Sequence, residues 1–350
     1  MHADAILAID IGGGTQDLLL WTPEDRIENC AKLVLPSPTR IVAKRISRAT
    51  SRRRPIFLYG TVMGGGSNTV ALKKHLDAGL KAYAEKEAAA TFHDNIEYVR
   101  RMGVEIVEEA PELAERIRLF DLDIENLNRL LDAYEVTLPG RLIVAVQDHG
   151  FSPNISNREM RFAQWKRFLD AGGKLEDLVY ATPPPENTRM GAIHKIRPDA
   201  LIVDTGPAAI MGAMLDDWAV SRIRDGLMVV NVGNAHTLAY LVAEGRVYGI
   251  YEHHTECLDF AKAMDQLQRF RNGLLTSEEV YSDMGHGVVY SEGVNDHFEN
   301  APMLATGPQR ALIKTGDVHP AAPFGDMMLS GCFGLVRAAL HAWKLNRSIC

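Results

Sequence analysis

The chain has 350 residues, of which 46% are hydrophobic and 24% charged, a balance typical of a folded protein rather than a disordered one. The formal net charge of -7 argues against a general nucleic-acid partner. One basic run, 43–54, is a local exception, which we interpret as a solvated helix face or loop rather than a phosphate-binding patch. The length exceeds what one core usually holds, so we expect two lobes.

The four cysteines do not suggest a metal or disulfide framework. They are scattered without a CxxC pair. No apolar run reaches the roughly 18 residues of a membrane span, and glycines interrupt the N-terminal apolar stretch, unlike in a signal peptide. We therefore expect a cytoplasmic protein with reduced thiols and no membrane partner.

In chain order, the first predicted elements are strands and a glycine turn. Strands are predicted at 5–10, 18–21, 32–35 and 55–62, a long helix from 67 to 92, and short strands at 104–108 and 119–123. The glycine run 64–66 partly matches a Walker A loop, but Gly66 stands where that loop has its lysine. We interpret it as a structural turn, or as a contact for a second anionic ligand at a helix N-terminus.

The second half repeats the opening order. A strand at 141–147, a helix at 157–169, a strand at 200–204 and a helix at 207–219 come first. Strands at 227–232, 237–242 and 246–251, with a glycine turn at 233–235, then reproduce the pattern of strand, turn, strand and strand. A strand at 327–329, a turn at 331–334 and a helix at 335–345 close the chain. This order indicates an internal duplication of architecture.

Two glycine turns carry the chemistry of phosphate binding. In the first, the strand ending at Asp10 delivers an acid, and Gly12, Gly13 and Gly14 let backbone amides approach phosphate oxygens without side-chain obstruction. Thr15 can add a hydroxyl, and Asp10 can hold Mg²⁺ through water. The alternative is a tight glycine hairpin without a ligand.

The second and third glycine motifs complete this predicted site. The second turn, with Asn231, Gly233, Asn234, His236 and Thr237, faces the first in a duplicated fold, so the two would clamp a triphosphate. In the third, Gly331, Cys332 and Phe333 would bring backbone against a nucleobase, with the phenyl ring stacking on it; the alternative is a helix-entry turn.

Together these motifs resemble the superfamily of actin, the DnaK-type chaperones, sugar kinases and acetate kinase. Residues 5–22 resemble its first phosphate loop, 227–242 its second and 327–338 its adenosine loop, while 203–214 resembles the helix that crosses between lobes. The resemblance implies a two-lobed α/β fold of the ribonuclease H-like kind, with duplicated mixed sheets, flanking helices and an interlobe cleft. The expected lobes are 1–204, with an insertion at 36–140, and 205–350, whose last helix packs back at the hinge.

The resemblance also implies ATP with Mg²⁺ as ligands. Asp10 matches the metal-associated acid, with Asp17 a second metal contact, and Gln147, Asp148 or Asp204 would orient the acceptor or water. The first phosphate loop includes Gln16. The chain departs from the superfamily at Asn231, where an aspartate is usual and an asparagine can serve neither as a base nor as a full metal charge. Cys332 stands where glycine is common.

Four further segments resemble a poorly characterised bacterial and archaeal family that is labelled as pyruvate formate-lyase activating enzymes. They are QDHGFSPN, TPPPENTRM, EHHT and DMGHG. Such activases hold an iron–sulfur centre with a CxxxCxxC triplet. The chain contains no such triplet, so we exclude radical chemistry by this chain alone.

The 12 histidines are the unusual feature, because several lie in glycine-rich or acidic loops. The residues concerned are His149, Glu252, His253, His254 and His286, with His236 placed to touch a γ-phosphate. They predict either a second-substrate pocket with a general acid or base, or a transition-metal site, since imidazole with carboxylate suits such ions. The alternative is that each histidine has a separate capping or packing role.

Three functions remain open. The first is an ATP-dependent enzyme, either a small-molecule kinase or an ATPase that drives activation of a partner. The second is a nucleotide sensor with little turnover, which Asn231 favours. The third is a metal-handling accessory protein that uses the histidine loops. The partners implied are a nucleotide and an unidentified small molecule or protein.

Overall fold

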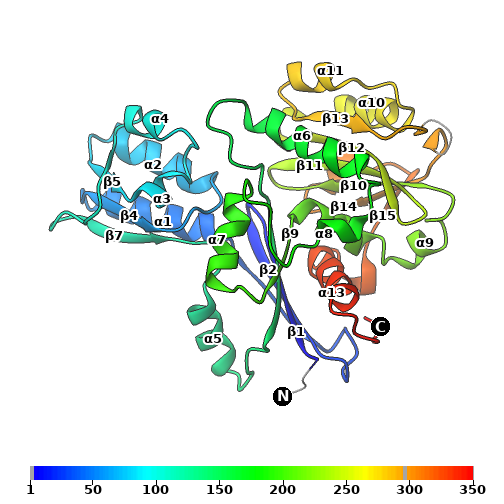
Figure 1. The fold of residues 1–350 in the computed structure, drawn as a ribbon, viewed down its shortest axis with the longest axis horizontal. Helices are drawn as coiled ribbons and strands as arrows, with labels where there is room; N and C mark the ends of the chain where they lie inside the picture. The colour runs from blue at the N-terminus through cyan, green and yellow to red at the C-terminus, as the bar shows by residue number, and fades with distance from the viewer. Residues whose placement is uncertain (1–3, 295–297, 350) are drawn as a thin grey trace.

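The computed structural model describes residues 4–294 and 298–349 and builds them into three β-sheets with helices around and between them (Figure 1). Two of the sheets repeat one topology, and the third belongs to the segment between residues 36 and 141. No helix in the described part of the chain is both long and apolar enough to cross a membrane.

The first sheet has the order β3-β2-β1-β8-β9. Its strands are β1 (Ile6–Ile11), β2 (Thr15–Trp21), β3 (Ala31–Pro36), β8 (Arg141–Val146) and β9 (Leu201–Val203). The first three strands pair antiparallel, whereas β1, β8 and β9 run parallel. Strands β1 and β8 are buried almost throughout because helices and loops cover both faces of the sheet, so they read as continuous apolar runs rather than alternating ones.

The second sheet repeats this order and adds one strand at its edge. Its strands are β10 (Leu227–Val232), β11 (His236–Ala243), β12 (Arg246–His254), β13 (Gly287–Tyr290), β14 (Met303–Thr306) and β15 (Val318–Pro320). The order is β13-β12-β11-β10-β14-β15, with β10, β11 and β12 antiparallel and β10, β14 and β15 parallel. The predicted repeat of strand, turn, strand and strand is confirmed in β1–β3 and β10–β12, and with it the two-lobed α/β fold of the actin-like class. The sequence did not predict the other three strands of this sheet, β13, β14 and β15.

Two helices join the duplicated sheets. Helix α8 (Thr205–Ala213) follows the last strand of the first sheet yet contacts β10 and β14 of the second. Helix α13 (Ser330–Ala342) follows the second sheet and contacts β1, β2 and β8 of the first (Figure 1). They cross where a Cβ on Gly212 would lie 1.6 Å from the carbonyl oxygen of Ser330, and a Cβ on Gly334 would lie 2.1 Å from that of Ala208. Only glycine allows this approach.

The segment between β3 and β8 forms its own four-stranded parallel sheet, β6-β5-β4-β7, beside the duplicated body (Figure 1). Its strands are β4 (Ile56–Gly60), β5 (Ala82–Ala84), β6 (Val104–Ile106) and β7 (Glu115–Leu119), and its helices are α1 (Pro38–Ser51), α2 (Ser67–Asp77), α3 (Lys86–Ala89) and α4 (Ile96–Arg101). The basic run begins in α1, which buries Val42, Ile46 and Ala49, and its last three arginines, at 52–54, follow the helix.

Several predicted boundaries in this segment and at the chain end are wrong. The long helix to residue 92 ends at Asp77, because a turn with Gly79 at φ +71° leads into β5. The strand predicted at 119–123 lies earlier, at β7. Residues 327–329 form no strand, and the glycine turn predicted at 331–334 is the first part of α13. The helix predicted at 207–219 is divided into α8 and α9 (Asp217–Val220).

The remaining helices cover the sheets from outside. They are α5 (Ile124–Asp132), α6 (Asn157–Asp170), α7 (Thr188–Ile196), α10 (Phe260–Arg271) and α11 (Ser277–Ser282). Helix α6 contacts β12 and β13, so a helix that lies between β8 and β9 in the chain packs on the second sheet.

Candidate functional site

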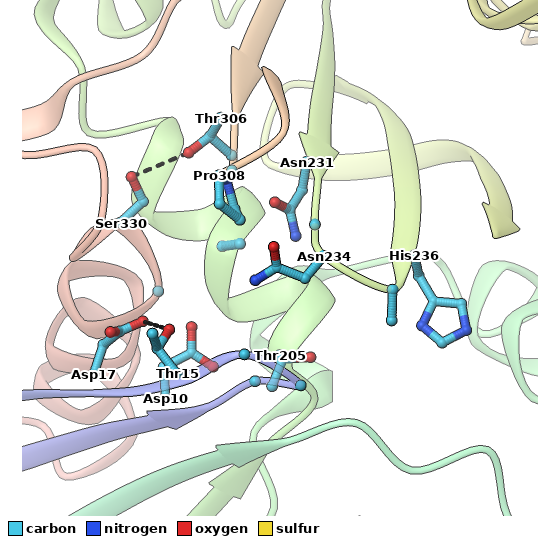
Figure 2. A pocket seen from close by; sticks show the side chains of 18 of the residues that line it. Asp10, Thr15, Asp17, Thr205, Asn231, Asn234, His236, Thr306, Pro308 and Ser330 are labelled. Carbon is cyan, nitrogen blue, oxygen red and sulfur yellow. Dashed lines mark hydrogen bonds between the residues drawn. The ribbon is translucent and has the colours of Figure 1, made fainter. Parts of the chain in front are cut away.

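The two predicted glycine turns adopt the same closure and face each other. The N–H of Gly12 donates to the carbonyl oxygen of Thr15 at 2.9 Å, and the N–H of Gly233 donates to that of His236 at the same distance. A Cβ on Gly14 would lie 2.6 Å from the side-chain nitrogen of Asn234. Between the turns lies a cavity of 120 Å³ (Figure 2).

Two carboxylates stand at one side of this cavity. Asp10 and Asp17 are directly paired across β1 and β2, and the Oδ1 atom of each is buried without a hydrogen-bond partner in the described part of the chain. Burial and the neighbouring Asp17 raise the pKa of Asp10 well above its usual range. Burial raises the pKa of Asp17 to about 7, although a 3.3 Å hydrogen bond from Thr15 opposes the shift. Two buried like charges with free oxygens fit a bound cation.

The first turn of α13 lines the cavity beside Asp10. A Cβ on Gly331 would lie 1.9 Å from Oδ2 of Asp10, so glycine is required there by close approach and not by a turn. The next two residues point into the core: Cys332 Sγ donates to the backbone oxygen of Asp17 at 3.1 Å, and Phe333 packs edge-on against Phe324. The third motif is therefore a helix start, and the predicted stacking of the Phe333 ring on a base is wrong, because that ring is fully buried.

Most of the residues predicted to bind the nucleotide or Mg²⁺ line the cavity together with Gln147, a predicted catalytic residue, and a few do not. Those that line it are Asp10, Gly12, Gly13, Gly14, Thr15, Asp17, Gln147, Asn231, Gly233, Asn234, His236 and Gly331. Gln16 instead donates its side-chain amide to the backbone oxygen of Pro36 at 3.0 Å. The hydroxyl of Thr237 is 3.0 Å from that of Thr255, so Thr237 bonds to this neighbour and does not line the cavity.

Asp148 and Asp204 belong to a buried network centred on Arg161, a residue that the sequence did not single out. The guanidinium of Arg161 binds both oxygens of Asp204, at 2.7 and 3.1 Å, and donates to Oε2 of Glu252 at 3.0 Å. Asp148 accepts from the backbone N–H groups of Gly150 and Met190, at 2.9 Å each. Asp148 follows β8, Asp204 follows β9 and Glu252 lies near the end of β12. Arg161 of α6 therefore joins the ends of these three strands.

A second group of side chains meets at the end of this network. The ligand atoms of His149, His236, Glu252 and His286 all lie within 4.8 Å of one another. Glu252 is fully buried and His286 is 3% exposed. Arg161 holds the pKa of Glu252 well below its usual range despite burial, and burial lowers the pKa of His236 to about 4 and of His286 to about 3. The group therefore combines an ionised carboxylate with neutral imidazoles.

The two other predicted histidines are placed differently. His253 is buried, with its ring nitrogens 3.0 Å from the backbone oxygen of His254 and 3.3 Å from Asp283. The half-buried ring of His254 lies with its centroid 4.9 Å from that of His236. Alternation along β12 explains the split, because Glu252 and His254 share one face of the strand and His253 points to the other.

The glycine run at 64–66 has structural partners. The N–H of Gly64 donates to Asp121 at 3.3 Å, and its oxygen accepts from Asn68 at 3.0 Å. Arg189 packs against the same glycine, with a guanidinium nitrogen 2.6 Å from where a Cβ would stand.

Comparison with known proteins assigns the family. Residues 63–312 match the profile of the family described as "Putative pyruvate format-lyase activating enzyme (DUF1786)". The chain belongs to this family. The match includes β5 to β14, but it begins after the first glycine turn. It therefore contains all four members of the histidine–glutamate group, which are His149, His236, Glu252 and His286. No curated protein matches the chain.

Among solved structures, two are similar over nearly the whole chain. The ethanolamine utilization protein EutJ from Carboxydothermus hydrogenoformans shares 9% identity, with 96% of this chain and 90% of that one covered and a TM-score of 0.30. A chain from a PilM-PilN type IV pilus biogenesis complex shares 12% identity over 97% of this chain and 99% of its own, with a TM-score of 0.39. We base the fold assignment on the strand order of the two duplicated sheets.

Proposed function

We propose that the chain binds a nucleoside triphosphate with Mg²⁺ between its two glycine turns. The observation that carries this proposal is the pair of carboxylates of Asp10 and Asp17, which line a cavity walled by backbone glycines and whose buried Oδ1 atoms have no hydrogen-bond partner among the described residues. Carboxylate oxygens are the ligands Mg²⁺ takes from a protein, usually one or two beside water and phosphate. A cation there would neutralise two like charges that otherwise oppose each other across the β1–β2 pair.

The size of the cavity indicates which part of the ligand it receives. Its 120 Å³ is well below the roughly 300–1,000 Å³ of pockets that enclose a drug-sized ligand. We propose that the phosphates occupy the space between the turns. The base would lie at the rim formed by Pro308, Met327 and Met328, since Cys332 and Phe333 are committed to the core.

We propose that turnover is slow. Asn231 occupies in β10 the position that Asp10 occupies in β1, as the fifth residue of a six-residue strand before the glycine. An amide cannot remove a proton from water or an acceptor. Gln147 lines the cavity, but its amide nitrogen donates to Glu252 at 3.1 Å. Its orientation is therefore set by a residue that lies outside the phosphate site. An ATPase that drives a partner, a phosphotransferase and a sensor all remain compatible with this site.

Calorimetry tests the proposal. ATP, ADP and inorganic phosphate are titrated with Mg²⁺ into the wild type, Asp10→Asn and Asp199→Asn, the last an exposed acid paired with Arg197. We expect ATP to bind the wild type and Asp199→Asn equally, and Asp10→Asn at least about tenfold more weakly, the effect of losing about 1.4 kcal/mol. Equal ATP affinity in all three proteins, or none in the wild type at millimolar ATP, would refute the proposal.

ADP release in the same samples separates the alternatives. A sensor binds ATP with almost no ADP release, whereas a phosphotransferase releases ADP only with an acceptor. If Asn231 limits turnover, Asn231→Asp raises the rate of ADP release. An unchanged rate in this variant would show that the amide is not the limit.

A further inference from the structure

We propose that His149, His236, Glu252 and His286 form a binding site for one divalent first-row transition-metal ion, beside the phosphate cavity and distinct from the Mg²⁺ position. The site goes beyond nucleotide binding and does not depend on it. It also differs from the set of histidines that the sequence suggested, because His253 is committed to Asp283 and to backbone.

The distances fit four ligands around one ion. Oε1 of Glu252 lies 4.0 Å from Nε2 of His149 and 3.9 Å from Nδ1 of His286. Zinc–nitrogen bonds of about 2.0–2.1 Å place neighbouring ligand atoms roughly 3 to 4 Å apart. The group is therefore close to its bound arrangement, and small side-chain rotations bring its atoms, now within 4.8 Å of one another, to bonding distance.

The carboxylate is oriented for this role. Its Oε2 atom accepts from Arg161 at 3.0 Å and from the indole nitrogen of Trp165 at 3.4 Å. Its Oε1 atom accepts only from Gln147 among the described residues and faces the imidazoles. Ligands of bound metals are commonly fixed by such outer hydrogen bonds.

The imidazole nitrogens need a partner that the described residues do not provide. Nε2 of His149, Nε2 of His236 and both ring nitrogens of His286 are buried without a hydrogen bond. A neutral imidazole carries one donor and one acceptor, and buried polar groups are nearly always satisfied. One cation would give all three rings a partner beside the same carboxylate. The described residues offer no separate partner for any of these ring nitrogens.

The donor set indicates the kind of ion. Three imidazoles and one carboxylate suit zinc, iron, cobalt or nickel, whereas magnesium and calcium take oxygen ligands. The four residues come from the loop after β8, the start of β11, strand β12 and the residue before β13, so the ion would tie the first duplicated sheet to the second. Because His236 also lines the cavity, the ion would lie against its wall.

Metal analysis of tag-free, nucleotide-free protein tests the site, so that its outcome is independent of ATP binding. Protein from cells grown with added zinc and iron is analysed for metal per chain. Chelator-treated protein is then titrated with Co²⁺ and with Zn²⁺ against a chromophoric chelator. We expect about one ion per chain in the wild type, a Co²⁺ absorption spectrum typical of nitrogen and oxygen ligands, and tight Zn²⁺ binding.

Four variants identify the ligands. His286→Asn and Glu252→Gln each weaken Zn²⁺ binding at least about 100-fold and abolish the Co²⁺ spectrum, more than loss of an outer hydrogen bond would. His93→Asn, in the segment between β3 and β8, and His341→Asn, at the end of α13, replace exposed histidines and bind Zn²⁺ as the wild type does. Circular dichroism confirms that each variant is folded.

Either of two results would overturn the proposal. One is folded wild-type protein that binds neither Co²⁺ nor Zn²⁺ more tightly than the His286→Asn variant. The other is metal binding lost equally in His93→Asn or His341→Asn, which would assign the ion to exposed histidines.

Discussion

Replacing Arg161 by methionine should destabilise the protein more than any surface change, because one guanidinium compensates two buried carboxylates. Arg161 is 2% exposed, Asp204 5% and Glu252 0%. Methionine fills much of the same volume without charge. It leaves both carboxylates, and the backbone oxygen of Asp148 that also accepts from Arg161, without this partner.

The magnitude follows from the contacts. Removing one partner of a buried ion pair typically costs about 3–5 kcal/mol. The cost per carboxylate has a ceiling, because a carboxyl with an ordinary pKa of about 4.3 can take up a proton at pH 7 for roughly 3.7 kcal/mol, at about 1.36 kcal/mol per pH unit. The cation–π contact of Arg161 with Trp165, 4.4 Å from the ring centre, is lost as well. We expect a total of about 4 kcal/mol or somewhat more.

Thermal unfolding of chelator-treated protein measures this loss. For lobes of this size, about 4 kcal/mol corresponds to a fall in Tm of roughly 8–16 °C. The control is Arg167→Met on the same helix, whose ion pair with Glu186 at 3.0 Å is largely exposed, so the cost is about 0–1 kcal/mol. Equal unfolding temperatures for Arg161→Met and Arg167→Met would contradict the predicted loss of stability.

Three further predictions concern packing, pH and coupling. Gly212→Ala should lower Tm clearly, because its Cβ would meet backbone of α13, whereas Gly191→Ala in α7, with nothing within 4 Å, should raise it slightly; equal shifts would refute the tight crossing. Burial lowers the pKa of His75, so only the unfolded state gains the proton as the pH drops under 6.5. The free energy of unfolding should then decrease by up to about 1.4 kcal/mol per pH unit. His75→Gln should lose that part of the pH dependence in urea titrations, and parallel curves for both proteins would contradict it. Since His236 joins both proposed sites, Zn²⁺ should change ATP affinity by the same factor as ATP changes Zn²⁺ affinity; no change in either titration would show the sites to be independent.

The sequence predicted the duplicated architecture well because its signals are local. Apolar runs such as 6–11 and 227–232 end in glycine turns, and both their type and order are confirmed. The glycines of 331–334 misled for a physical reason. They permit close approach of α13 to Asp10 and α8, and sequence alone cannot separate a glycine needed for packing from one needed for a turn.

The histidine–glutamate group was only partly predictable. The motifs EHHT and DMGHG drew attention to Glu252 and His286, and the strand alternation of β12 could have excluded His253. The role of Arg161 had no such signal. It lies in a helix rich in arginine, and only the packing of α6 on the second sheet shows that this one is buried between Asp204 and Glu252.

The duplicated turn has a different side chain at the same backbone position in each half of the molecule. Thr15 and His236 close equivalent turns, each accepting the glycine N–H at 2.9 Å through its backbone oxygen. The closing hydrogen bond is made by backbone atoms alone, so the turn keeps its shape whichever side chain stands at this position. The first copy carries a hydroxyl beside two aspartates, and the second carries an imidazole beside Glu252 and two other histidines. The proposed phosphate site and the proposed metal site would thus use the same position of two equivalent turns, on either side of one cavity.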